Sequence, residues 1–339
     1  MKTRIAFPFC AAACIFLLII DARTAIIGAQ DGVNMCLTAV VPSIFPFLVL
    51  SGFLTSSIRG ANSYLLRPLS RLLGIPKGTE GIFLTGVLGG YPIGAQEVHT
   101  AWSNGQLNNV QANRMLSFCN NAGPAFLFGI LGAQFPEYWM LWLLWGIQIL
   151  SSILISLILP GRSNNSNFHG QSNPISFVYA LKRGVSTMGY ICGWIILFRI
   201  LIAFLDRWLL WLFPTPIQVM ICGFLELANG CCSVNSIGSV GLRFIISSAV
   251  LTFGGICVLM QTASIIKGLS VRRYLLGKTL QVIISVWLAV LAQNLLFPAE
   301  YKISFSDSIT MIIAVILIIF FIICKKIQKK SSIPAAAVV

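Results

Sequence analysis

Hydrophobic runs follow one another along almost the whole chain, with short polar, charged or glycine-rich segments between them. The runs cover residues 5–27, 33–57, 80–103, 109–134, 138–160, 176–205, 214–237, 243–267, 272–297 and 308–324. A hydrocarbon layer of ~30 Å needs about 20 apolar residues in each helix that crosses it. The pattern therefore predicts an all-α polytopic membrane protein.

Two of these runs fit re-entrant hairpins better than complete spans. Runs 80–103 and 214–237 each divide into two arms of about ten residues, and such an arm reaches only ~15 Å, half the membrane. The other eight runs then cross the membrane. With the N-terminus inside, most of the 23 basic residues become cytoplasmic, as the positive-inside rule requires. The sequence thus predicts about eight transmembrane helices plus two re-entrant hairpins, with both termini cytoplasmic.

The basic residues that this topology assigns to the cytoplasm come from five segments. They are Lys2, Arg4, Arg59, Arg67, Arg71, Lys77, Arg162, Lys182, Arg183, Lys267, Arg272, Arg273, Lys278, Lys325, Lys326, Lys329 and Lys330. The acidic residues assigned to the opposite side are Asp31, Glu137, Asp206, Glu300 and Asp307.

The same topology predicts an inverted repeat. In each half a span is followed by a hairpin and two further spans, but the two halves enter the membrane from opposite sides. Inverted repeats with interrupted helices recur among transporters. The expected segments are an N-terminal transmembrane helix at 1–30, a first repeat at 31–160, a polar linker at 161–175, a second repeat at 176–300, and a C-terminal transmembrane helix with a basic tail at 301–339.

Composition excludes a soluble protein. Of the 339 residues, 57% are hydrophobic and 9% are charged, and the mean hydropathy is +0.88. A soluble domain of this composition would expose a large apolar surface. The net charge of +14 is explained by basic loops beside apolar runs. Because no basic patch lies on a soluble domain, we expect no nucleic acid among the partners.

The cysteines and histidines do not predict a metal or cofactor site. The 10 cysteines lie mostly in apolar runs without a CxxC pair, and only 2 histidines accompany them. We therefore expect packing residues, and neither a metal site, a cofactor nor a disulfide framework.

The N-terminus resembles a signal peptide, because Lys2 and Arg4 precede an apolar run. Asp21 and Arg23 follow that run in place of a small-residue cleavage site. We therefore expect an uncleaved first span.

The strongest local signal is LTGVLGGYPIGAQE at 84–97. Its candidate site residues are Gly89, Gly90, Tyr91, Pro92 and Gly94. In a helix, Gly costs ~1 kcal/mol and Pro ~3 kcal/mol relative to Ala, so a break is expected here. One interpretation is a hairpin tip whose freed amides face a solute. The other is a tight helix–helix contact through small residues.

A second break is predicted in SFCNNAGPAFLF at 117–128. Asn120 and Asn121 are polar amides in an apolar run, directly before Gly123 and Pro124, and Pro disrupts the backbone ladder there. Two carboxamides and exposed carbonyls would make a neutral hydrogen-bonding site for a solute. Alternatively, the asparagines satisfy the broken backbone or join helices.

The second half has looser counterparts. Glu226 and Asn229 lie in the second hairpin run, and Gly254 and Gly255 interrupt the run after it. An ionisable group inside a membrane is costly and is a functional candidate by default. Glu226 could therefore couple a proton or cation, or pair with an arginine, either Arg243 or Arg199.

Three arginines lie far from the cytoplasmic clusters. Arg114 and Arg243 are near predicted helix ends, which favours snorkelling to the interface. Arg199 lies deeper, in WIILFRILIAF. An Arg fork binds carboxylates bidentately, so Arg199 is the better candidate to bind an anionic solute.

Enzyme signatures such as HExxH, a phosphate-binding P-loop and a G-x-S-x-G elbow do not occur in the sequence. We therefore expect a protein without catalytic residues.

The pair LGGYPIGA at 88–95 and SFCNNAGP at 117–124 resembles the YlbJ-type sporulation integral membrane proteins. These fall within the nucleoside-recognition (Gate) domain grouping, which includes concentrative nucleoside transporters. The resemblance implies two Gate-like repeats and a fold similar to those transporters. Two positions depart from the expected pattern: Gln96 stands where a Lys is expected, and Cys231-Cys232 where hairpin glycines are expected.

The resemblance also implies a function. A YlbJ-type protein is expected in spore maturation and cortex formation, as a carrier that moves dipicolinate. The partners would be a small anionic solute, the lipid bilayer and a coupling proton or cation, with the oligomeric state open. The location would be the cell membrane and, in a sporulating cell, the outer forespore membrane. The alternatives are a transporter of a nucleoside or metal ion, and a non-transporting assembly protein for the cortex.

Overall fold

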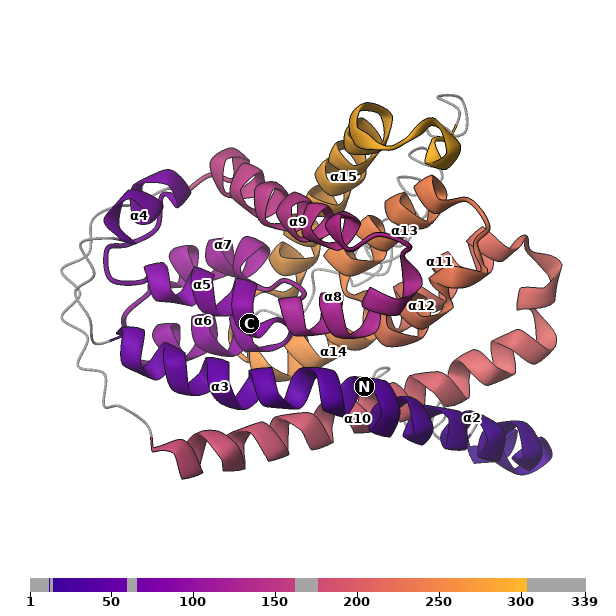
Figure 1. The fold of residues 1–339 in the computed structure, drawn as a ribbon. Coiled ribbons are helices and arrows are strands. Elements are labelled where there is room, and N and C mark those ends of the chain that lie inside the picture. Colours follow the sequence, from indigo (N-terminus) through magenta and orange to yellow (C-terminus); the bar gives the residue numbers. More distant parts are fainter. Residues whose placement is uncertain (1–11, 13–14, 60–65, 162–175, 304–339) are drawn as a thin grey trace, which may run out of the picture.

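The computed structural model describes residue 12 and residues 15–59, 66–161 and 176–303. The regular elements of this part are helices (Figure 1), as expected of an apolar chain that must satisfy its backbone internally. Long helices form two outer layers. Short and interrupted helices lie between them, those of the first half on the left of Figure 1 and those of the second half on the right.

One outer layer contains α2 (Ala22–Met35), α3 (Val41–Arg59) and α10 (Phe177–Trp208). A π-helical turn at Cys36–Val40 joins α2 to α3 without a break. The sequence pattern predicted a gap between the first two spans at 28–32. This prediction is wrong, because the chain turns at Asp21 and is helical from residue 22 to residue 59. Gly28 lies against α10, where an added Cβ would be 2.9 Å from the Ala203 Cβ, so a small residue brings the two helices together.

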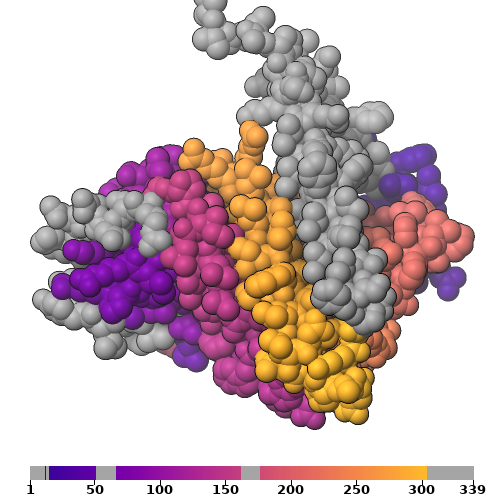
Figure 2. Space-filling model, turned by 90° about the horizontal axis from the view of Figure 1, so that it is seen from above, coloured from indigo at the N-terminus to yellow at the C-terminus, as the bar shows by residue number. Residues whose placement is uncertain are grey.

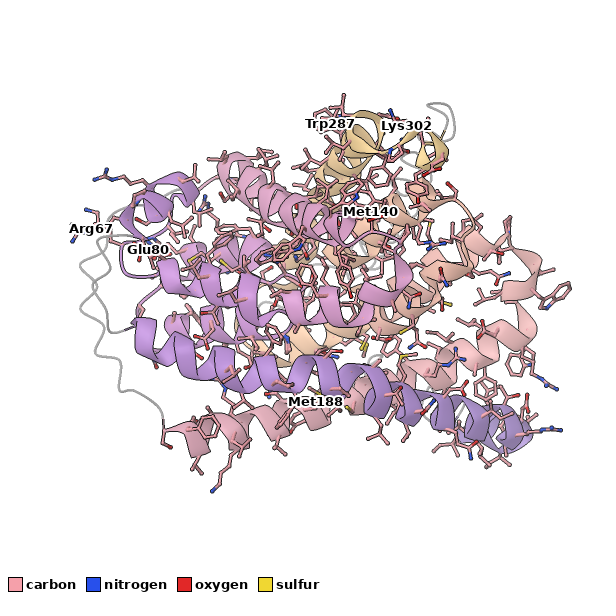
Figure 3. The ribbon with its side chains drawn as sticks, viewed as in Figure 1. Arg67, Glu80, Met140, Met188, Trp287 and Lys302 are labelled. Atoms are coloured by element: carbon pink, nitrogen blue, oxygen red, sulfur yellow. The ribbon has the colours of Figure 1, made fainter. Side chains whose placement is uncertain are left out.

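The other outer layer contains α9 (Tyr138–Ile158) and α15 (Val271–Leu296). Figure 2 shows these helices side by side on one face of the molecule. Their outward side chains include Trp142 and Trp287, each 58% exposed, and Figure 3 shows Trp287 projecting from the fold. Met140, also labelled there, is fully buried. An apolar outer face over a packed inner face is what lipid contact requires.

The two halves place equivalent elements in the same order. In the first half, α4 (Arg67–Leu73) is followed by the pair α5 (Glu80–Gly89) and α6 (Ile93–Ser103), and then by α7 (Asn109–Cys119) and α8 (Pro124–Ile130). In the second half, the pair is α11 (Thr215–Leu225) and α12 (Leu227–Ser233), followed by α13 (Val240–Phe253) and α14 (Gly255–Ile265). Both predicted hairpin runs are therefore pairs of short helices, and both predicted breaks interrupt a helix.

Five helical stretches in the described residues are long and apolar enough to cross a membrane. They are Ala22–Leu50, Tyr138–Ile158, Phe177–Trp208, Val240–Ile265 and Val271–Leu296. The helices α5 and α11 are apolar but shorter, in agreement with hairpin arms. The run at 308–324 and most of the run at 5–27 lie outside the described residues, so the count of eight spans and the inverted orientation of the halves stay predictions.

Arg114, in the middle of α7, and Arg243, in the first turn of α13, do not snorkel. Both are buried, at 6% and 9% exposure. Their carbonyl acceptors are those of Leu73, Gly74, Ser156 and Leu159 for Arg114, and of Gln134, Asn235 and Ile237 for Arg243. Each arginine therefore satisfies carbonyls left open at the ends of neighbouring helical segments, and the snorkelling interpretation is wrong.

Candidate functional site

The first hairpin tip packs directly against the break between α7 and α8. Gly90 has φ = +76°, a region that favours glycine, and a Cβ there would be 2.6 Å from the Gly123 nitrogen. Cβ atoms on Gly86 and Gly94 would overlap the Cys119 carbonyl. The tight-contact interpretation of the glycine motif is thus confirmed, as a contact of backbone on backbone. The bond between Tyr91 and Pro92 is cis.

Asn120, which is fully buried, joins the first break to three other helices. Its Oδ1 accepts a hydrogen bond from the Ala95 amide of α6 at 3.3 Å. Its Nδ2 donates to the Thr262 hydroxyl of α14 at 3.2 Å and to the Tyr274 hydroxyl of α15 at 3.0 Å. Asn120 therefore joins helices, as one interpretation proposed, and does so across the two halves.

Asn121 is the acceptor on which three donors converge. Its Oδ1 accepts from the Ser152 hydroxyl of α9 at 3.1 Å and, from α15, the Lys278 ammonium at 3.1 Å and the Gln281 amide at 3.0 Å. Its Nδ2 donates to the Phe118 carbonyl at 2.8 Å, which satisfies part of the broken backbone. The segment between α7 and α8 is thus held by side chains from α9 and α15.

Lys278 was assigned to a cytoplasmic segment by the sequence pattern, and that assignment is wrong. Its side chain is 1% exposed, and its ammonium also donates to the Gln281 Oε1 at 2.8 Å. The nitrogen lies 5.2 Å from the centroid of the Tyr91 ring, a cation–π distance. The signal that sequence reasoning missed is the spacing of Lys278, Gln281 and Ser285, which puts three polar residues on one face of an apolar helix.

In the second hairpin, Glu226 caps the helix that follows it. Its carboxylate accepts from the Ala228 amide at 3.0 Å, and from the Asn229 amide and side chain at 2.7 Å each. Glu226 is 2% exposed. In the described part of the chain it forms no ion pair with Arg199 or Arg243, so the pairing alternative is wrong.

The second interrupted helix is supported by the first hairpin. Gly254 breaks it with φ = +81°, and the freed Thr252 carbonyl accepts a hydrogen bond from the Tyr91 hydroxyl at 2.9 Å. A Cβ on Gly254 would lie 3.0 Å from the Tyr91 ring, and one on Gly255 3.1 Å from the Gly223 carbonyl of α11. Both hairpins therefore touch the second break.

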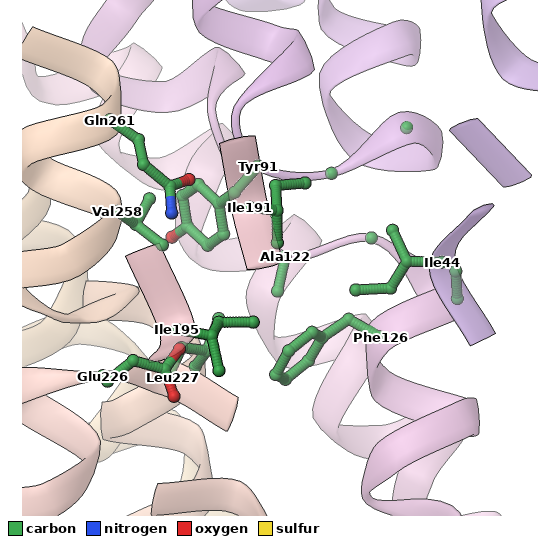
Figure 4. Close-up of a pocket in the computed structure, with 14 residues that line it drawn as sticks. Ile44, Tyr91, Ala122, Phe126, Ile191, Ile195, Glu226, Leu227, Val258 and Gln261 are labelled. Carbon is green, nitrogen blue, oxygen red and sulfur yellow. The ribbon is translucent and has the colours of Figure 1, made fainter. Parts of the chain in front are cut away.

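A small cavity lies where these elements meet (Figure 4). Its volume is about 40 Å³, enough for a few water molecules and well below the ~300 Å³ of a small ligand pocket. The lining residues are Ile44, Gly89, Gly90, Tyr91, Ala122, Gly123, Ala125, Phe126, Ile191, Ile195, Glu226, Leu227, Val258 and Gln261. Figure 4 shows the side chains of Tyr91, Gln261, Glu226 and Leu227 among the residues that line the cavity. The polar side chains in the lining thus come from both halves.

The structure brings most of the predicted site residues to this cavity or directly behind it. Pro92, Gly94, Asn120, Asn121 and Pro124 belong to the two segments that line it, Asn229 binds Glu226, and Gly254 and Gly255 contact the two hairpins. Arg199 is the exception. It lies on α10, where it pairs with Asp31 of α2 at 2.9 Å and with Asp206 of α10 at 3.4 Å, and it is not among the residues that line the cavity.

Comparisons with known proteins agree with the resemblance of the two motifs. No protein-family model and no solved structure matches the chain. The "Sporulation integral membrane protein YlbJ" of Bacillus subtilis (strain 168) is 24% identical over 290 residues, which cover 72% of this chain and 71% of that protein. Together with the five long apolar helices, this similarity shows that the chain is a multi-pass integral membrane protein related to the YlbJ-type sporulation integral membrane proteins.

Proposed function

We propose that this protein is a membrane carrier of sporulation, and not an enzyme, which moves dipicolinate or a similar small anion by alternating access. The observation that carries the proposal is the meeting of two helical hairpins and two interrupted helices around one small cavity. Discontinuous helices that meet at a central site are a recurring transporter architecture. Similarity to a sporulation integral membrane protein supports the biological setting.

The small size of the cavity supports a mechanism with a conformational change. At about 40 Å³ it is too small for a pyridine ring with two carboxylates, so this arrangement corresponds to a closed state. In the proposed cycle, the two halves (31–160 and 176–300) rock against each other as inverted Gate-like repeats. The contact between the first hairpin and the second break, through Tyr91 and the Thr252 carbonyl, is then made and broken during transport.

Glu226 is the proposed coupling group. It is a buried carboxylate in the lining of the cavity, and a buried ionisable group between interrupted helices is well placed to bind a proton or cation. The proposed location is the cell membrane, with both termini cytoplasmic, and in a sporulating cell the outer forespore membrane.

The test is solute uptake by lipid vesicles that contain the purified protein, with and without a proton gradient. We expect saturable uptake of dipicolinate. Asn121→Leu removes the acceptor on which three donors converge and should abolish uptake, while size-exclusion chromatography and circular dichroism show that the variant is inserted and folded. Uptake that persists in folded Asn121→Leu protein would contradict the site, and a folded wild-type protein without dipicolinate uptake would contradict the function.

A nucleoside is the second candidate solute. The cavity presents the Gln261 carboxamide and the Tyr91 ring, groups that can bind the polar edge and the face of a base. The same vesicles distinguish the two solutes: competition by excess nucleoside favours this candidate, and competition by dipicolinate alone favours the anion.

A further inference from the structure

Lys278 has no acidic partner in the described part of the chain, so the charge of its protonated form is not neutralised there. The ion pairs in this part join Arg183, Arg199 and Arg207 to acidic residues, and none includes Lys278. Its two hydrogen-bond acceptors, on Asn121 and Gln281, are neutral amide oxygens. A buried cation without an anionic partner is strongly unfavourable. The local electrostatics therefore favour the binding of an anion.

The donors around Asn121 also outnumber the acceptor that they share. A carboxamide oxygen offers two lone pairs, yet donor groups of Ser152, Lys278 and Gln281 all lie within 3.1 Å of the Asn121 Oδ1. The single proton of the Ser152 hydroxyl is shared with the Gln148 carbonyl, which lies 2.9 Å away. Ser151 adds another hydroxyl beside the Gln281 amide, at 3.3 Å. A carboxylate oxygen accepts more hydrogen bonds than an amide oxygen and makes stronger ones with a cation. This arrangement of donors suits an anionic oxygen better than the neutral one that it holds.

The donor cluster is adjacent to the central cavity. Tyr91 lines the cavity and contacts the Lys278 ammonium with its ring, and Ala122, which follows Asn121 in the chain, also lines it. A shift of the segment between α7 and α8 would withdraw the Asn121 oxygen and connect the donors to the cavity. Opening of the two halves, as proposed above, provides such a shift.

We propose that Lys278, Gln281 and Ser152 form the carboxylate-binding subsite of the carrier, in which the Asn121 side-chain oxygen occupies the place of a solute oxygen in the closed state. The inference rests on the proposed function, because it assigns the residues that recognise the anion. It gives Lys278 the role that the sequence pattern gave to Arg199.

Equilibrium binding to the purified full-length protein tests this subsite. The probes are dipicolinate and its neutral diamide, which has the same ring and shape but no carboxylates. We expect the wild type to bind dipicolinate at least tenfold more tightly than the diamide. Lys278→Gln should reduce that preference by about tenfold or more, while Lys267→Gln, which removes the same charge from an exposed position, should leave it unchanged.

The outcomes separate the subsite from the carrier function. If folded wild-type protein binds dipicolinate and folded Lys278→Gln retains the full preference, the subsite is wrong and the carrier proposal stands. If folded wild-type protein binds neither probe, the proposed function fails and the subsite fails with it.

A second variant tests the subsite without removing Lys278. Asn121→Asp places a permanent carboxylate at the point where the three donors converge. We expect its melting temperature to rise, because the buried ammonium gains a counter-charge, and we expect dipicolinate to no longer raise that temperature further. If Lys278 had only a structural role, the variant would melt at a higher temperature but dipicolinate would still raise its melting temperature further. An Asn121→Asp protein that keeps the wild-type dipicolinate shift would therefore overturn the proposal.

Discussion

The two interrupted helices differ in how far they are opened. Between α7 and α8, four residues from Asn120 to Gly123 leave the helix, and both end residues have extended backbone. Between α13 and α14, only the two residues Gly254 and Gly255 depart from helical backbone, each with φ = +81°. The first break therefore exposes several backbone groups, whereas the second is a sharp bend with little backbone to satisfy.

The two breaks also differ in the polar side chains that surround them, which are more numerous at the first break. Amide, hydroxyl and ammonium groups from α9, α14 and α15 surround the first break. At the second break, the Tyr91 hydroxyl of the other half binds the freed carbonyl. Polar side chains are therefore concentrated at the first break. The second break is a bend that is stabilised by a side chain of the other half. Among the described residues of the second half, the buried carboxylate is Glu226, in the hairpin.

The largest expected effect on stability comes from glycine-to-alanine variants, which compare how tightly the backbone is packed at the two breaks. Gly94→Ala should destabilise the fold by about 3 kcal/mol, because the new Cβ overlaps a backbone carbonyl that cannot rotate away. Gly254→Ala should cost less, about 1–2 kcal/mol, because it meets a strained φ and an aromatic ring that can shift. Reversible unfolding in mixed micelles measures both free energies.

Gly146→Ala is the control for these glycine variants. It lies on α9 with open space around its Cβ position, so little change is expected. An equal loss of stability in Gly94→Ala and Gly254→Ala would remove the contrast in packing between the two breaks.

A smaller effect is expected at the second hairpin. Glu226→Ala removes the N-cap of α12 and its three hydrogen bonds, which should cost about 2 kcal/mol. Glu137→Ala is the matched control, because Glu137 occupies the N-cap position of α9 without a side-chain cap bond and should be replaceable without loss. The two free energies of unfolding, compared under the same conditions, check this. A loss no larger than that of the control would mean that Glu226 does not stabilise its hairpin.

The smallest effect concerns the contact between the halves. Tyr91→Phe removes only the hydroxyl that donates to the Thr252 carbonyl, so the expected cost is about 1 kcal/mol. Tyr138→Phe, at a residue that is 71% exposed, should leave the melting temperature unchanged. If both variants melt as the wild type does, the second break does not depend on the first hairpin.

The breaks could be predicted from the sequence because their signals are local. Gly90 with Pro92, and Gly123 with Pro124, interrupt apolar runs at positions where a helix cannot continue without loss. The helical pairs at the predicted hairpins follow from the same argument, since each arm is too short to span. The apolar outer faces follow from the length of the runs.

The partners could not be predicted because they come from distant parts of the chain. Asn121 and Lys278 are separated by 157 positions. The topology rule grouped Lys278 with the cytoplasmic basic residues because it lies close to Arg272 and Arg273 at the start of the run 272–297. Arg114 was misplaced for a similar reason, because the carbonyls that it satisfies belong to α4 and α9. Pair contacts of this kind depend on how helices pack, which hydropathy does not report.

Hydrogen–deuterium exchange with and without dipicolinate tests the central claim most directly. It compares peptides that cover the two breaks, 118–125 and 252–257, in the purified protein. If a small anion binds at the first break, dipicolinate should slow exchange strongly in the first peptide and weakly or not at all in the second. Equal protection of both peptides, protection of the second alone, or no change in either would contradict the account.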